Sequence, residues 1–403
     1  MCPALEFPCL AQQRRALAEA CAAAFAVPLD HVRVVFAPYR VCPLGAHIDH
    51  QGGPVLGMTI NAGTLLAYAP RATPSIALRS MNFPGDVAFD FDAITPPEPG
   101  AWGNYARCAT RAMLDAHRLR HGFAGITTGT LPGCGLSSSA SVVLAYLHAL
   151  ADVNGLTLAP WDYVHLARRA ENTYFGLRNG ILDQTSIIFS RRGHVVMIDT
   201  RNERATPLPQ PAFSQRYRLL IAYSGISREL IATGYNTRVQ ECRDAAAELG
   251  RLSGAAHATV LSDLHDDVFA RHGAHLPDTL RKRAQHYFSE VRRVHDGVAA
   301  WQAGDVARVG TLMTQSCRSS IELFDAGSPL VRDLQACVCA AHGVCGARFN
   351  GGGFGGCVAG IVTRDDAVNA GADVLRSFRA LHPDCAGRAR VYLADSYDGI
   401  SWL

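Results

Sequence analysis

The chain has 403 residues, a formal net charge of +3 at pH 7 and 48% hydrophobic residues. This length exceeds the size at which a single hydrophobic core stops growing, so it predicts two domains. The small net charge, without a basic run that would mark a binding tail, argues against nucleic acid and anionic membranes as partners. We therefore expect a soluble globular protein whose ligands are small molecules.

The first segment, residues 10–28, carries paired arginines followed by small residues and could imitate an export signal. Acidic residues interrupt both parts of such a signal, and Leu17, Cys21 and Phe25 recur at helical spacing. We expect an amphipathic helix here and no membrane-spanning segment anywhere. The thirteen cysteines are expected to be reduced thiols, which predicts a cytoplasmic location.

Strands and helices are expected to alternate through the first half. The residue patterns predict strands over 31–38, 55–70 and 193–199, and helices over 103–120, 139–155 and 159–176. Three prolines in the five positions 207–211 predict a boundary, so we expect domains of residues 1–212 and 213–403. Strands over 217–224, 356–362 and 389–396 among long helices complete an α+β fold.

A stretch rich in glycine and serine, LPGCGLSSSAS at residues 131–141, runs directly into a predicted helix. Gly133 and Gly135 permit a sharp turn, and the serines lie where a helix N-terminus has unpaired N–H groups. Such a junction binds phosphate. The stretch lacks the lysine of a Walker A loop and is no dinucleotide fingerprint. An ordinary helix cap explains one serine but not three in a row.

Two more stretches fit a phosphoryl-transfer site. The run FNGGGFGGC at residues 349–357 is explained equally well by a bulged turn before a strand when it is taken alone. Glu171 ends a predicted helix, and Asp183 follows twelve positions later. Phosphoryl transfer needs a magnesium ligand and a carboxylate that orients or deprotonates the attacking hydroxyl, which two separated acids can supply. Each acid alone is better explained as a surface carboxylate.

In this order, the motifs resemble the galactokinase branch of the GHMP superfamily of small-molecule kinases. Residues 39–53 resemble its sugar signature GRVNLIGEHTDYNGG, residues 180–184 its GIMDQ and residues 346–357 its GARMTGAGFGGC, while LPGCGLSSSAS matches its phosphate loop. Smaller similarities occur at WGNY (102–105) and GYNTRVQEC (234–242). The resemblance covers nearly the whole chain.

The resemblance implies an N-terminal domain like ribosomal protein S5 domain 2, a ferredoxin-like C-terminal domain and an active site in the cleft between them. It implies ATP with its phosphates over Gly133, Cys134, Gly135, Leu136, Ser137, Ser138, Ser139 and Ala140, and Mg²⁺ held by Ser139 and Glu171. It also implies Asp183 as the base for the anomeric hydroxyl, with Arg40 beside it. The implied sugar-binding residues are Ala46, His47, Asp49, Gly180 and Tyr235.

Ala46 departs from the galactokinase pattern, because it stands where galactokinases carry a glutamate that hydrogen-bonds the C6 hydroxyl of the sugar. Its loss removes a partner for O6 and a negative charge, and a C6 carboxylate explains both changes. Gly234 replaces a usual acid, and His50 and Gln51 replace Tyr-Asn. Residues 37–53 closely resemble plant galacturonokinases. We therefore expect ATP-dependent phosphorylation of D-galacturonate at the anomeric C1 oxygen, giving α-D-galacturonate 1-phosphate and ADP.

Two alternatives stay open at this point. A galactokinase, or a kinase of another galacto-configured sugar, would tolerate Ala46 as the loss of one hydrogen bond. A catalytically silent sugar sensor on the same fold is a further alternative, against which the intact set of Arg40, Glu171 and Asp183 argues. A monomer is the default expectation.

The group that holds the C6 carboxylate is also left open. The candidates are the backbone N–H groups around Ala46, the side chain of His50 and the side chain of Arg228.

Overall fold

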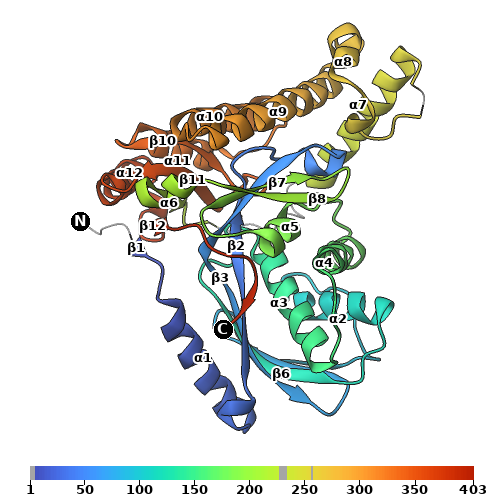
Figure 1. The fold of residues 1–403 in the computed structure, drawn as a ribbon, viewed down its shortest axis with the longest axis vertical. Helices are drawn as coiled ribbons and strands as arrows, with labels where there is room; N and C mark the ends of the chain where they lie inside the picture. Colours follow the sequence, from blue (N-terminus) through green and yellow to red (C-terminus); the bar gives the residue numbers. More distant parts are fainter. Residues whose placement is uncertain (1–4, 227–233, 256) are drawn as a thin grey trace.

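The structure is a computed structural model of the chain, and it describes residues 5–226, 234–255 and 257–403. Two sheets form its framework (Figure 1). The first has the order β13-β2-β3-β6-β4-β5, with β7 paired to the start of β3 and β8 paired to β7. Its strands are β2 (Arg33–Val41), β3 (Val55–Arg71), β4 (Ser75–Ser80), β5 (Val87–Asp90), β6 (Gly122–Gly129), β7 (His194–Asp199), β8 (Arg204–Pro209) and β13 (Ser401–Trp402).

Helices cover both faces of this sheet. The helix α1 (Leu10–Phe25) lies on one face, and α2 (Asn104–Ala116), α3 (Ser138–Val153), α4 (Pro160–Phe175) and α5 (Leu182–Phe189) gather on the other (Figure 1). Side chains alternate along β2, because successive strand residues point to opposite faces. Val34 and Phe36 accordingly pack in the cluster with α1, whereas Val35 and Ala37 pack in the cluster with α3. The strands and helices predicted for the first half are confirmed.

The second sheet has the order β1-β12-β9-β11-β10. Its strands are β1 (Leu5–Glu6), β9 (Tyr217–Tyr223), β10 (Val344–Phe349), β11 (Cys357–Thr363) and β12 (Arg390–Ala394). The helices of this half are α6 (Pro211–Arg216), α7 (Tyr235–Ser253), α8 (Asp266–His272), α9 (Asp278–Gln302), α10 (Val306–Glu322), α11 (Pro329–Ala340) and α12 (Ala367–Leu381). Short 3-10 turns are η1 (Leu29–His31), η2 (Asp49–Gln51), η4 (Leu261–Asp263), η5 (Gly273–His275) and η6 (Pro383–Cys385).

The two halves share a hydrophobic core. Leu219 and Ile221 of β9 pack with α10 and with Val41 and Met58 of the first sheet. The opposite face of β9 packs with α11 and α12. The prediction of helices packed on a small sheet is confirmed.

Each terminal strand belongs to the sheet that is formed mainly by the opposite half of the chain. The strand β1 pairs in parallel with β12 of the second sheet, and β13 pairs with β2 of the first sheet. The division at residue 212 therefore stays a prediction, and no single cut separates the two sheets. Each of these strands has two residues, which is too short for a detectable periodic pattern.

The proline-rich stretch predicted as the boundary has regular structure. Pro207 and Pro209 lie in β8, which among the described strands pairs with β7 alone, so that it is an edge strand. An edge strand tolerates proline because the missing N–H costs no ladder bond. Pro211 begins α6, where the missing N–H would have had no intrahelical partner. In the described part of the chain, no helix is both long and apolar enough to cross a bilayer.

Candidate active site

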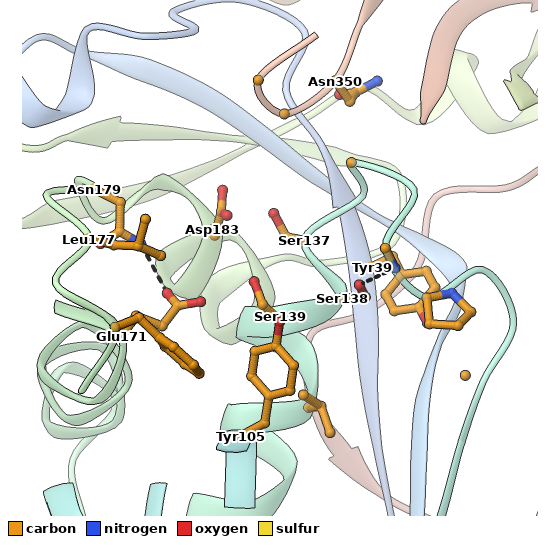
Figure 2. A pocket seen from close by; sticks show the side chains of 18 of the residues that line it. Tyr39, Tyr105, Ser137, Ser138, Ser139, Glu171, Leu177, Asn179, Asp183 and Asn350 are labelled. Carbon is orange, nitrogen blue, oxygen red and sulfur yellow. Dashed lines mark hydrogen bonds between the residues drawn. The ribbon is translucent and has the colours of Figure 1, made fainter. Parts of the chain in front are cut away.

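The residues predicted for the site line one cavity of about 670 Å³ between the two sheets. Figure 2 shows Ser137, Ser139, Glu171 and Asp183 around part of this cavity. The predicted residues in its wall are Arg40, Ala46, His47, Asp49, Gly133, Gly135, Ser137, Ser138, Ser139, Glu171, Gly180, Asp183 and Tyr235. Positions that span almost two hundred residues of sequence are thus brought together by the fold.

The predicted phosphate loop precedes α3, and every second residue from Gly133 to Ser137 has a left-handed backbone. Gly133, Gly135 and Ser137 have φ values of +74°, +79° and +59°, in the left-handed region. The Ser138 hydroxyl accepts a hydrogen bond from the Gly133 N–H at 2.9 Å, which closes the loop onto the first turn of α3. The buried Ser137 hydroxyl has no partner among the described residues. The loop and the free N–H groups of the first helical turn together suit an anion.

Three residues predicted for this loop do not present their side chains to the cavity. Leu136 and Ala140 are fully buried, and Cys134 is buried beside them. The side chains of Cys134 and Leu136 belong to one hydrophobic cluster, and that of Ala140, in α3, belongs to another. Only their backbone N–H groups remain available to a phosphate.

The second glycine-rich run packs directly against the phosphate loop. The Cys357 N–H donates to the Cys134 carbonyl at 2.8 Å. A Cβ on Gly135 would lie 2.7 Å from the Asn350 carbonyl oxygen, and one on Gly356 would lie 2.4 Å from the Cys134 carbonyl oxygen. These glycines are therefore required by the close approach of two loops, which a bulged turn alone does not explain.

We expect Gly135→Ala to raise the KM for ATP about tenfold or more, because the substitution combines a left-handed backbone with a clash that moves the loop. Gly155→Ala is the matched control, since Gly155 also has a positive φ, of +63°, but a Cβ there would meet nothing within 4 Å. Steady-state kinetics at varied ATP measures the difference. Equal KM values in the two variants would show that the contact with Asn350 does not shape the loop.

The predicted catalytic pair forms a direct ion pair. The Arg40 Nε lies 2.8 Å from Oδ1 of Asp183, and its Nη1 donates to the Gly135 carbonyl at 3.2 Å. Arg40 is 4% exposed and comes from the end of β2, whereas Asp183 lies in the first turn of α5. One buried guanidinium therefore connects the phosphate loop to the carboxylate predicted as the base.

Glu171 is a buried carboxylate next to the phosphate loop. Its Oε2 accepts hydrogen bonds from Asn179 at 2.9 Å and from Gln184 at 2.7 Å (Figure 2 shows the first). The Ser139 side chain lies near the same carboxylate and favours its ionised form. Burial and, after it, the charge of Asp183 raise the pKa of Glu171 to about 7. Neither amide was among the predicted site residues, although Gln184 directly follows the predicted base.

These residues fit a magnesium ion. A carboxylate whose pKa is raised by burial and by a second carboxylate is a place where a cation would relieve repulsion, and the Ser139 hydroxyl is a suitable neutral ligand. Within the described residues, the cavity holds no cluster of three histidine, cysteine or acidic ligands. Mg²⁺ is commonly held by one or two protein ligands together with phosphate oxygens, which agrees with so small a set.

Asp49 and Gly180, which are both predicted to bind the sugar, lie in close contact. A Cβ on Gly180 would lie 2.2 Å from Oδ2 of Asp49, so only glycine fits there. The same carboxylate oxygen accepts a hydrogen bond from the Leu182 N–H at 3.2 Å. Burial, and then the charge of Asp183, raises the pKa of Asp49. The contact places a hydrogen-bonding carboxylate beside the predicted base.

His47 lies in the loop between β2 and β3 and has a left-handed backbone. Its φ is +64°, which is uncommon outside glycine and costs energy that surrounding contacts must offset. The ring stacks on Phe324 with centroids 4.6 Å apart, and its Nε2 has no hydrogen-bond partner among the described residues. Burial holds the pKa of His47 well below its usual value, so the ring is neutral at neutral pH.

Of the three candidates for a carboxylate-binding group, one finds no support in the structure and another is not tested by it. The His50 ring packs against Tyr235 and Phe324 and does not contribute to the cavity wall. Arg228 lies outside the described residues. Tyr235 itself lines the cavity, as predicted.

Aromatic side chains line another part of the cavity. They are Phe83, Trp102, Tyr105 and Phe175, and Figure 2 shows Tyr105 beside Ser139. Only Trp102 and Tyr105 fell within a motif noted in the sequence. Apolar walls with few polar groups are typical of sites for small molecules and cofactors.

Comparisons with known proteins agree with this geometry. Residues 104–191 match the GHMP kinases N terminal domain, residues 298–380 the GHMP kinases C terminal domain and residues 22–70 the galactokinase galactose-binding signature. A galacturonokinase of Arabidopsis thaliana is 40% identical over 88% of this chain and 89% of its own length. A galactokinase of Roseiflexus sp. (strain RS-1) is 33% identical over 91% and 92%.

A solved structure shows the same architecture over the full length. The structure of Lactococcus lactis galactokinase complexed with galactose superposes with a TM-score of 0.88 at 28% identity, covering 97% of this chain and 100% of that one. The predicted two-domain α+β fold is thereby confirmed. On these matches, the chain belongs to the galactokinase family of the GHMP kinases.

Proposed function

We propose that this sugar kinase transfers the γ-phosphoryl group of ATP to the anomeric C1 hydroxyl of D-galacturonate. Sugar 1-kinase activity with ATP as co-substrate is the activity of the galactokinase family. The choice of galacturonate rests on one observation, the small apolar side chain of Ala46 in the wall of the sugar site. The cytoplasmic location and the monomeric state remain predictions.

In the proposed reaction, the phosphate loop before α3 binds the triphosphate of ATP. The aromatic side chains in the cavity wall hold its adenine ring. The Asp183 carboxylate accepts the proton of the anomeric hydroxyl and orients its oxygen toward the γ-phosphorus. Arg40 forms an ion pair with that carboxylate and offsets negative charge on the transferring group. Ser139 and Glu171 would hold Mg²⁺, which supplies charge neutralisation to the β- and γ-phosphates.

Sugar recognition falls to the loop after β2. An ionised carboxylate can accept hydrogen bonds from two neighbouring hydroxyls, which suits Asp49. The neutral His47 ring offers its unpartnered Nε2. Ala46 is 7% exposed and lines the same wall, so that a sugar lying on this loop approaches a methyl group. A galactokinase glutamate at this position would repel a C6 carboxylate, whereas alanine does not.

The Arabidopsis galacturonokinase supports this substrate, and the bacterial galactokinases support galactose as the second candidate. The test is purified protein with Mg-ATP, assayed for ADP release against galacturonate, glucuronate, galactose and arabinose. We expect the highest kcat/KM with galacturonate. Galactose turned over faster than galacturonate would overturn the proposal, and an absence of turnover with every sugar would favour a sensor.

A further inference from the structure

The substrate loop is held from behind by the long helix α9. The Gly45 N–H donates to Oε1 of Glu290 at 2.8 Å, and the Ala46 carbonyl accepts from Nε2 of His286 at 3.0 Å. His286 and Glu290 are four residues apart and therefore project from the same face of the helix. Both side chains are buried. The backbone on either side of Ala46 is thus fixed by contacts from residues about 240 positions away in the sequence.

The protonation of His286 follows from its two partners. A carbonyl oxygen can only accept, so Nε2 carries the ring proton, and Nδ1 accepts from the Ser319 hydroxyl at 2.8 Å. Burial lowers the pKa of His286 to about 4, so the ring is neutral at neutral pH. The Ala46 carbonyl therefore fixes the tautomer, and the Ser319 hydroxyl completes the hydrogen bonding of the ring.

This hydrogen bond also determines where the next N–H group points. The C=O and N–H of a trans peptide point in opposite directions, and the described chain has no cis peptide bond. With its carbonyl directed at α9, the peptide between Ala46 and His47 directs the His47 N–H away from that helix. Among the described residues, this N–H has no hydrogen-bond partner. An unpaired buried donor is costly, so it marks a place where a ligand acceptor is expected.

A second buried donor or acceptor lies on the same residue. His47 is 9% exposed and lines the cavity, and its Nε2 is also unpartnered within the described chain. The backbone N–H and the ring Nε2 of His47 are therefore both without a hydrogen-bond partner among the described residues.

The charge behind the loop is positive. Glu290 lies between two guanidinium groups, at 2.7 Å from Arg293 and 3.8 Å from Arg348. Although burial opposes its ionisation, these arginines leave the pKa of Glu290 lowered, so one carboxylate faces two cations. Arg348 is 1% exposed and lines the cavity. Arg348 is therefore a buried cation at the cavity wall that shares its nearest carboxylate, Glu290, with Arg293, and a cation so placed favours an anion in the adjoining space.

We propose that the His47 peptide N–H, backed by the positive charge of Arg348, receives the C6 carboxylate of a hexuronate substrate, and that His286 is the residue that positions this N–H. The inference rests on the proposed specificity for a uronate and adds the group that binds its carboxylate. A C6 hydroxyl can accept the same hydrogen bond but carries no charge, so it gains less from this arrangement.

The test compares His286→Phe with wild-type enzyme on galacturonate and galactose. The phenyl ring keeps the packing on Phe324 but cannot donate to Ala46. We expect the KM for galacturonate to rise about tenfold to a hundredfold, the KM for galactose to rise less than about threefold, and kcat to stay nearly constant. His286→Gln, which retains a donor, should recover much of the loss. His295→Phe is the matched control on an exposed position of the same helix and should match wild type.

Equal losses on both sugars would overturn the positioning role, as would a failure of His286→Gln to recover more than His286→Phe. If His286→Phe does not fold, Ser319→Ala takes its place. It should also raise the KM for galacturonate more than the KM for galactose, by a smaller factor. Amide NMR of ¹⁵N-histidine-labelled protein gives a direct readout, since the His47 signal should move with galacturonate and much less with galactose. A wild-type enzyme inactive on galacturonate would instead reject the proposed function itself.

Discussion

Ala46→Glu is expected to lower kcat/KM for galacturonate about a thousandfold while changing that for galactose far less. Two like charges about 4 Å apart repel by about 4 kcal/mol at an effective dielectric near 20, which corresponds to that factor. The new carboxylate would lie in the cavity wall at a buried position, where solvent screens it little.

Ala46→Gln separates the charge from the volume of the new side chain. Glutamine has the size of glutamate without its charge, so it should reduce galacturonate turnover much less than glutamate does. Kinetics of both variants on both sugars measures the two contributions. A loss that is the same for galacturonate and galactose in Ala46→Glu would mean that Ala46 does not face C6.

Asp183→Asn is expected to reduce kcat by about a hundredfold to ten thousandfold on any sugar that the wild type phosphorylates. The amide oxygen can still accept from Arg40, so the ion pair becomes a hydrogen bond and the fold is retained. The asparagine cannot take up the hydroxyl proton. Binding of ATP, measured by calorimetry, should change little because Asp183 is not part of the phosphate loop.

Asp266→Asn provides the control for this substitution. Asp266 also lies in the first turn of a helix, but it is exposed on α8 and away from the cavity wall. The activity of the Asp266→Asn variant should equal that of the wild type. Substantial turnover by Asp183→Asn in the same assay would remove Asp183 from the base role.

Local sequence predicted the parts of this site that depend on residue type and short spacing. The phosphate loop is an example, because left-handed φ values at Gly133 and Gly135 and a serine-rich helix start are local requirements. Gly180 is another, since only glycine leaves room for the Asp49 carboxylate. Motif order then sufficed to associate Arg40 with Asp183, and the structure places them 2.8 Å apart.

Other features left no local trace. The strand β1 pairs with β12, and β13 pairs with β2, so both pairings join residues near opposite ends of the chain. Neither two-residue strand has a periodic pattern. The glycines at 351–356 were equally consistent with a bulged turn until the phosphate loop was seen against them. Asn179 and Gln184 are ordinary polar residues in the sequence and become partners of Glu171 only in the folded chain.

The resemblance of the ordered motifs to the galactokinase pattern indicated the family and predicted the residues of the phosphate loop and of the loop after β2, while periodicity and chain order predicted the α+β fold class. It also identified Ala46 as the departure that bears on the substrate. Only the tertiary structure decided which way the peptide after Ala46 faces. That orientation depends on His286 and Glu290, which reach the loop from α9. Hydrogen bonds between residues so far apart in the chain follow from packing, which no local pattern encodes.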